Sequence, residues 1–221
     1  PCFQGRFLQT RHMLYNIQTM PSRNREKTYV PEAYYHIYNR GVEKRDIFLD
    51  DKDYRVFLNL LKRYLDTKPV DDNSGREYEW LHERLELLGY CLQPNHYHLL
   101  IYVHDDTAMT RLFRGVNTSY TTYFNKKYKR IGPLFQDRYK ASHILRDSYL
   151  LHISRYLHLN PRNWRSWPYS SLDYYLNRKN AGWINPQRLL GMFEGDDYLE
   201  FVADYEDHKR ALDEIKLELA H

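Results

Sequence analysis

The fold is decided by one stretch, Pro94-Asn95-His96-Tyr97-His98-Leu99-Leu100. The apolar run continues to Val103, which predicts a buried strand entered through a Pro-Asn turn. Because side chains alternate between the two faces of a strand, His96 and His98 point the same way. Two imidazoles side by side supply half of a divalent-metal site. The alternative is one hydrogen-bonded and one solvated histidine at the mouth of a strand.

Periodic segments lie on both sides of this strand. Upstream, the patterns predict an aromatic strand over 33–39, a helix over 52–65 capped by Asp50 or Asp51, and a strand over 85–92. Because only Gln-Pro-Asn separates the last of these strands from the histidine strand, we expect a hairpin there.

Downstream, the patterns predict a helix over 107–128, a strand over 138–145 and a helix that is capped by Asp147 or Ser148 and runs to about Leu159. The resulting βαββαβ order is that of an α+β, ferredoxin-like sandwich, in which helices cover one face of an antiparallel sheet. We expect the other face to stay open to nucleic acid. A further helix is expected to run to about Arg178.

Composition narrows the class of protein. The 221 residues are 42% hydrophobic and 28% charged, as expected of a folded soluble protein. No stretch of about 18 apolar residues predicts a membrane span, and the first twenty residues lack the apolar core of a secretory signal. The two cysteines lie far apart, so we expect neither a disulfide framework nor a thiolate metal site, and we expect a reducing cytosol.

Charge is distributed unevenly along the chain. Residues 111–146 hold nine Lys or Arg against one Asp, a net charge of +8, while residues 194–221 hold ten acidic residues against three basic ones, a net charge of −7. A basic segment with interleaved aromatic residues suits a polyanion such as DNA. The acidic segment prompts a hypothesis that it folds over the basic one and competes with DNA, against the alternative of a solvated helical appendage.

Several segments, taken in chain order, resemble the single-tyrosine HUH transposases, in the branch of the REP-associated tyrosine transposases. They are Tyr35–Gly41, Cys91–Leu100, Tyr120–Asn125, Gly132–Lys140, Arg155–Pro161 and Trp167–Ser171. The resemblance implies an HUH domain over 20–178 with a catalytic helix after the sandwich. It leaves 1–19 as a disordered or non-native leader and 179–221 as an acidic helical C-terminal extension.

The resemblance also implies a role for each matching residue. His96 and His98 correspond to the pair that binds a divalent cation, Mg²⁺ or Mn²⁺, and Asn160 to the residue that completes its coordination. Tyr156 corresponds to the nucleophile. The family cuts single-stranded DNA beside a hairpin, leaves a 5′-phosphotyrosine and a free 3′-OH, and reverses the attack to rejoin strands.

The same resemblance sets expectations for partners and location. We expect transposition or recombination at REP-like hairpin elements, by a monomer rather than a homodimer. The expected location is the bacterial cytoplasm, at the nucleoid and not at a membrane. The alternative is a domesticated protein that binds DNA hairpins without cleaving them. An HUH nuclease of replication or conjugation and a structural zinc protein fit the length and cysteine count less well.

The residues leave some roles open. Tyr156 is one of 22 tyrosines, and Tyr120 and Tyr123 are explained as core by the apolar stripe of their helix. His36 is either a third metal ligand or a buried histidine of the sheet. His152 is either a general base or a structural contact.

Five polar residues near the expected sheet ends are candidates for contact with DNA phosphates or unpaired bases. They are Asn39, Arg40, Asn95, Arg138 and Lys140. The alternative for each is an ordinary solvated side chain.

Overall fold

A computed structural model describes residues 29–71, 75, 77–193 and 197–205. The strands are β1 (Ala33–Arg40), β2 (Leu85–Gln93), β3 (His96–Val103) and β4 (Lys140–Ile144). The longer helices are α1 (Asp51–Leu65), α2 (Ala108–Lys127) and α3 (Asp147–Leu159). Shorter helical segments are η1 (Val42–Lys44), η2 (Trp164–Ser166), α4 (Leu172–Tyr175), α5 (Gln187–Leu190) and α6 (Tyr198–Ala203). The expected leader, 1–19, lies outside the described residues.

The four strands form one antiparallel sheet in the order β2-β3-β1-β4. This order and the βαββαβ succession confirm the ferredoxin-like prediction. The predicted hairpin is also confirmed, because Gln93 pairs with His96 across the two-residue turn Pro94–Asn95. β4 is shorter than predicted. It begins at Lys140, so Arg138 precedes the strand instead of sharing a strand face with Lys140.

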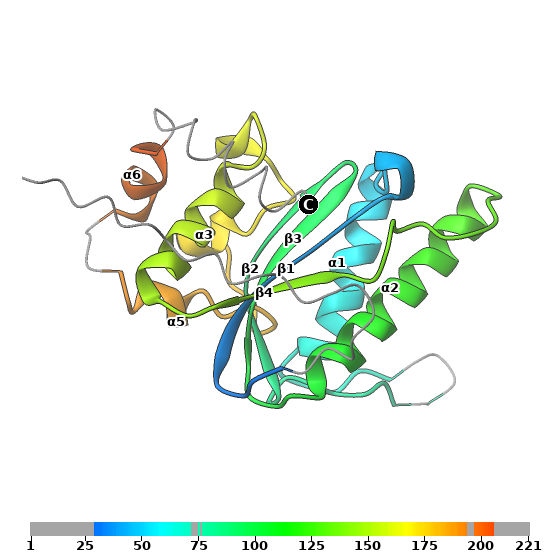
Figure 1. Ribbon diagram of the computed structural model, residues 1–221, viewed down its shortest axis with the longest axis horizontal. Coiled ribbons are helices and arrows are strands. Elements are labelled where there is room, and N and C mark those ends of the chain that lie inside the picture. Colours follow the sequence, from blue (N-terminus) through cyan, green and yellow to red (C-terminus); the bar gives the residue numbers. More distant parts are fainter. Residues whose placement is uncertain (1–28, 72–74, 76, 194–196, 206–221) are drawn as a thin grey trace, which may run out of the picture.

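One face of the sheet is covered by α1 and α2 (Figure 1). α1 begins after Asp50, one of the two caps that the sequence predicted, and its start is a capping box formed with Asp53. Asp53 of this box is fully buried, and its carboxylate accepts hydrogen bonds from Lys127 Nζ at 2.7 Å, Tyr123 OH at 2.9 Å and Tyr128 OH at 2.8 Å. A buried charge needs such partners, so this cluster ties α1 to α2.

The other face is not open, contrary to the expectation from the sequence. α3, α5 and α6 lie on the side opposite α1 and α2 (Figure 1). The physical reason is that the side chains of Leu88, Leu100, Tyr102 and Ile144 on this face are apolar, and they form a second buried cluster with α3 and the segments after it. Much of this face is therefore closed to nucleic acid.

The outer edge of β2 is covered by the Trp167–Ser171 segment. Leu92 N donates to Tyr169 O at 2.9 Å, and Trp167 Nε1 donates to Leu92 O at 2.9 Å. The helix expected to run to Arg178 is the four-residue α4. α3 also differs slightly from the prediction, because Arg146 and not Asp147 or Ser148 occupies its N-cap position.

α6 packs on the outer side of α3. His158 Nδ1 donates to Tyr198 OH at 2.9 Å, and this hydroxyl donates to Ser154 Oγ at 2.9 Å. The Arg155 guanidinium lies over the Phe201 ring at 3.6 Å. Residues 197–205 thus belong to the same packed body as α3, while 194–196 and 206–221, most of the acidic segment, lie outside the described residues.

Candidate active site

The candidate site lies on the two inner strands, β1 and β3, and faces α3. Register pairs Tyr38 with His98 and Arg40 with His96, so all four side chains share a face. The ring centroids of His96 and His98 are 4.9 Å apart. His98 is buried and His96 half-buried. The alternation that predicted a histidine pair is therefore present in the fold.

Each histidine of the pair contacts a neighbour through Nδ1. His96 Nδ1 lies 2.6 Å from Asn95 Oδ1, and Asn95 Nδ2 donates to Lys44 O at 3.2 Å. His98 Nδ1 lies 2.9 Å from Nε2 of His36, which is fully buried. A metal at either histidine would be bound through the other ring nitrogen, Nε2. Nε2 of His36 is already hydrogen-bonded to His98, so the geometry favours a supporting role for His36 over that of a third metal ligand.

α3 places Tyr156 against these rings. The Tyr156 ring centroid is 5.5 Å from that of His98 and 6.2 Å from that of His36, with edge-to-face geometry at both. Tyr156 is only 3% exposed. Asn160, one turn further along the chain, lies near enough to the Tyr156 side chain to favour the ionised form of its hydroxyl. Tyr156, Asn160 and the histidine pair are therefore brought together, although Asn160 follows the last residue of α3.

Burial and neighbouring charges set the protonation states. Burial, and secondarily Cys91, raises the pKa of Tyr156 above its usual value, while the Asn160 side chain and the Arg40 charge oppose that rise. Burial lowers the pKa of His36 to about 3. It also lowers the pKa of His98 well below its usual value, with smaller contributions from His96, His36 and Arg40. Near neutral pH the site thus holds a phenol and neutral imidazoles.

The donor set fits a modest divalent-cation site. Within the described residues no three His, Cys, Asp or Glu side chains gather in a way suited to a metal. A third protein donor would therefore be the amide oxygen of Asn160. Two imidazoles and one amide make a weaker site for a hard cation than carboxylates do, so we expect weak affinity for the cation alone, with DNA phosphate oxygens as further ligands.

The residues expected to contact DNA divide into two groups. Arg138 is exposed, Arg40 is half-buried, and half-buried Lys140 has its Nζ 5.7 Å from the Tyr38 ring centroid. Asn39 is 6% exposed, and its Nδ2 donates to Asp137 O at 3.2 Å. Asn39 and Asn95 are thus engaged within the fold, whereas Arg40 and Lys140 border the site and Arg138 lies on the segment before β4.

His152 does not lie in the site. Its side chain is exposed, and its ring centroid is 5.9 Å from that of Tyr205. Burial lowers its pKa, with a smaller contribution from Arg155. The structure therefore favours the structural-contact alternative over a general base.

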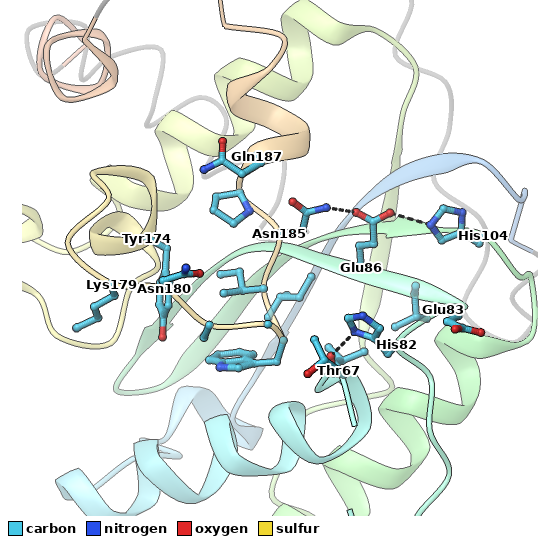
Figure 2. Close-up of a pocket in the computed structure, with 18 of the residues that line it drawn as sticks. Thr67, His82, Glu83, Glu86, His104, Tyr174, Lys179, Asn180, Asn185 and Gln187 are labelled. Atoms are coloured by element: carbon cyan, nitrogen blue, oxygen red, sulfur yellow. Dashed lines mark hydrogen bonds and ion pairs between the residues drawn. The ribbon is translucent and has the colours of Figure 1, made fainter. Parts of the chain in front are cut away.

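A separate cavity of about 890 Å³ lies at the opposite end of β2 from the histidine pair. Figure 2 shows Glu86 between Asn185 and His104, and it bonds to them at 2.6 and 2.8 Å. Arg188 also pairs with Glu86, at 2.6 Å. The half-buried carboxylate of Glu86 is thus paired within the fold itself.

The site can be compared with known proteins at this point. Residues 79–160 match the family model of IS200-like transposases. The matching segment runs from before β2 to the residue after α3 and contains His96, His98, Tyr156 and Asn160. The resemblance inferred from the sequence is thereby confirmed.

The fold has a solved counterpart. It is similar to the structure of a REP-associated tyrosine transposase bound to a REP hairpin, with a TM-score of 0.52, 16% sequence identity, and coverage of 75% of this chain and 92% of that chain. At this identity the likeness establishes the fold. A comparison with curated proteins gave no match.

Sequence reasoning missed the partners of the two histidines. It treated His36 separately from His98 and assigned Asn95 to DNA. The strand order of a ferredoxin-like sheet places the first strand beside the third, so the contact between His36 and His98 could have been anticipated. The bond between Asn95 and His96 depends on the conformation of the turn, which periodicity does not reveal.

Proposed function

We propose that this protein is a divalent-metal-dependent transposase-like enzyme that cleaves and rejoins single-stranded DNA beside hairpins. The observation that carries the proposal is the packing of Tyr156 against His98, with the Asn160 side chain placed to favour ionisation of Tyr156. The site segment matches IS200-like transposases, which supports strand transfer over other reactions at such a site.

In the proposed reaction the Tyr156 oxygen attacks the phosphorus of a phosphodiester. The bond from phosphorus to the 3′-oxygen breaks, a 5′-phosphotyrosine forms, and the phenol proton is lost while the leaving oxygen gains one. Because one phosphodiester replaces another, the reverse attack by a 3′-OH can rejoin strands without nucleotide hydrolysis. Asn160 and Arg40 both favour the phenolate that develops on Tyr156.

His96, His98 and Asn160 are the residues that would hold the cation. Bound there, Mg²⁺ or Mn²⁺ would withdraw charge from a non-bridging phosphate oxygen and orient the phosphate for in-line attack. Burial keeps the imidazole of His98 neutral near pH 7, which is the form that can bind a metal.

We propose that the DNA backbone reaches this site from the end of the sheet, along Arg40, Arg138 and Lys140. The proposed partner is single-stranded DNA with a REP-like hairpin, and the related transposase of known structure is bound to a REP hairpin. No helix in the described part of the chain has the length and apolarity needed to span a bilayer. Action as a monomer on nucleoid DNA in the bacterial cytoplasm belongs to the same proposal.

One observation favours the second candidate, a hairpin-binding protein that does not cleave. Tyr156 is only 3% exposed and its raised pKa keeps it a phenol, so a phosphate must gain access before any attack. A protein that binds the hairpin without opening this contact would never form the covalent bond.

The test is a trapping assay with end-labelled hairpin DNA carrying single-stranded flanks, in Mg²⁺ or Mn²⁺. The proposal expects a protein–DNA adduct that survives denaturation and is lost in Tyr156→Phe. Tyr120→Phe is the matched control, because Tyr120 is equally buried but lies in the helical core. Tight hairpin binding with no adduct from the wild-type protein would establish the second candidate instead.

A further inference from the structure

The two histidines of the site are held by different kinds of partner. Asn95 donates through Nδ2 to a backbone carbonyl, so the group it turns toward His96 is its own carbonyl oxygen. A carbonyl oxygen accepts and has no proton to give. His96 therefore carries its proton on Nδ1 and keeps the lone pair on Nε2, which is the tautomer that a metal ligand needs.

The partner of His98 is His36, which can act either as the hydrogen-bond donor or as the acceptor. Its Nδ1 is 2.9 Å from His36 Nε2, the ring centroids are 5.1 Å apart, and the ring planes differ by 14°. The hydrogen bond thus lies close to the plane of both rings. A neutral imidazole donates from one nitrogen and accepts at the other, so the shared proton can belong to either ring.

We propose that His36 is a positioning residue that sets the tautomer of His98, and that cation binding switches this buried histidine pair from one tautomer to the other. The inference rests on the proposed function only in taking His98 as a cation ligand. It adds a residue from β1 to the candidate cation ligands, which lie on β3 and directly after α3.

The two states hold the same number of protons. In the first, His36 Nε2–H donates to His98 Nδ1, and the second proton occupies His98 Nε2, where a cation would bind. In the second, His98 Nδ1–H donates to His36 Nε2, and His36 carries its other proton on Nδ1. Passing from the first to the second moves one proton across the hydrogen bond, releases one from His98 Nε2 to water, and takes one up at His36 Nδ1.

The surroundings of His36 favour the first state without a cation. His36 Nδ1 is buried, and it has no hydrogen-bond partner among the described residues. A buried N–H without an acceptor is costly, and the second state places a proton at this atom. A cation must offset that cost, whereas a fixed acceptor in place of His36 would remove it.

The experiment titrates the full-length chain with Mn²⁺ alone and measures the dissociation constant from the electron spin resonance of free Mn²⁺. His36→Phe keeps a ring but removes the acceptor, and we expect binding to weaken by about tenfold or more. His36→Gln offers a side-chain carbonyl, and we expect binding as tight as in the wild-type protein or tighter. His143→Phe is the matched control, since His143 is exposed and stacks on Tyr35 on the other face; it should bind as the wild-type protein does.

A second measurement reports the tautomers directly. Nitrogen-15 spectra of histidine-labelled wild-type protein should show His98 protonated on Nε2 without metal and on Nδ1 with Mg²⁺, while His96 stays protonated on Nδ1 throughout. If His36→Phe does not fold, these spectra and His36→Gln decide the question. Wild-type affinity in His36→Phe, affinity in His36→Gln as weak as in His36→Phe, or a His98 tautomer that ignores Mg²⁺ would each overturn the inference.

The outcomes also separate this inference from the proposed function. A wild-type protein that forms the Tyr156 adduct but does not bind Mn²⁺ overturns the histidine switch and leaves the covalent step standing. A protein whose Mn²⁺ affinity depends on residue 36 but that never forms an adduct loses the proposed cleavage and keeps the switch.

Discussion

Both faces of the sheet bury tyrosines, but the groups that contact these tyrosines differ between the two faces. On the face covered by α1 and α2, Tyr120 OH donates to a backbone carbonyl, Tyr123 OH to Asp53 and Tyr97 OH to Asn117. On the face covered by α3, Tyr156 lies against two imidazoles, with the Asn160 side chain near its hydroxyl. Burial raises the pKa of Tyr120 and Tyr156 alike. Neighbours that can hold a cation, and not burial, therefore distinguish the candidate nucleophile.

The largest effect is expected when one tyrosine hydroxyl is removed from each face of the sheet. Tyr156→Phe should abolish the covalent adduct and change stability little, because the nucleophilic oxygen is gone while the ring still packs. Tyr120→Phe should keep the adduct and lower the free energy of unfolding by about 1 kcal/mol, since one buried hydrogen bond is lost. Gel shift after denaturation and urea unfolding measure the two effects, and an adduct that persists in Tyr156→Phe would reassign the nucleophile.

The next largest effect is expected at Asp53, on the face of the sheet opposite the candidate active site. Asp53→Ala leaves the Lys127 ammonium beside the site of a lost carboxylate and frees two tyrosine hydroxyls, so we expect a loss of about 3–5 kcal/mol in the free energy of unfolding. Asp106→Ala, at an exposed carboxylate, should change it by less than about 0.5 kcal/mol. The adduct yield per folded molecule should not change, and a selective loss of adduct would show that the two faces are coupled.

A smaller effect on the free energy of unfolding is expected when the pH is lowered. Burial lowers the pKa of His158 to about 3, below its value in the unfolded chain, so the unfolded state binds the extra proton first as the pH falls. The stability contributed by neutral His158 is fully present above about pH 6.5 and is lost on going down toward pH 3, by about 2 kcal/mol at pH 5. Urea unfolding at pH 7 and pH 5 should therefore show a smaller drop for His158→Gln than for the wild-type protein. An equal drop in the two proteins would contradict this.

The two faces also differ in how far the sequence predicted them. Apolar stripes with periods of two and 3.6 predicted the strands, α1, α2 and the core positions of Tyr120 and Tyr123, because those residues bury one continuous surface. The covering of the second face was missed, since Leu100 and Tyr102 fit a strand buried on both sides as well as on one. The His36–His98 contact depends on register between strands far apart in the sequence, and local patterns carry no direct record of register.

The smallest effect is expected for the basic side chains at the rim of the site, and it concerns the salt dependence of DNA binding. Arg138 directly precedes Tyr139 and β4, and Lys140 Nζ lies 5.7 Å from the Tyr38 ring centroid, whereas Lys62 lies on α1 with Asp66 four residues away at 3.7 Å. Each phosphate contact to single-stranded DNA contributes about 0.7 to the slope of log affinity against log salt concentration, because a condensed counterion is released. Arg138→Ala and Lys140→Ala should each reduce that slope by about 0.7, and Lys62→Ala should leave it unchanged. Fluorescence anisotropy of a labelled hairpin with single-stranded flanks, titrated at several salt concentrations with Tyr156→Phe protein to prevent cleavage, measures the slopes. Equal reductions for all three variants would mean that DNA senses the net charge of the protein and not an oriented path into the site.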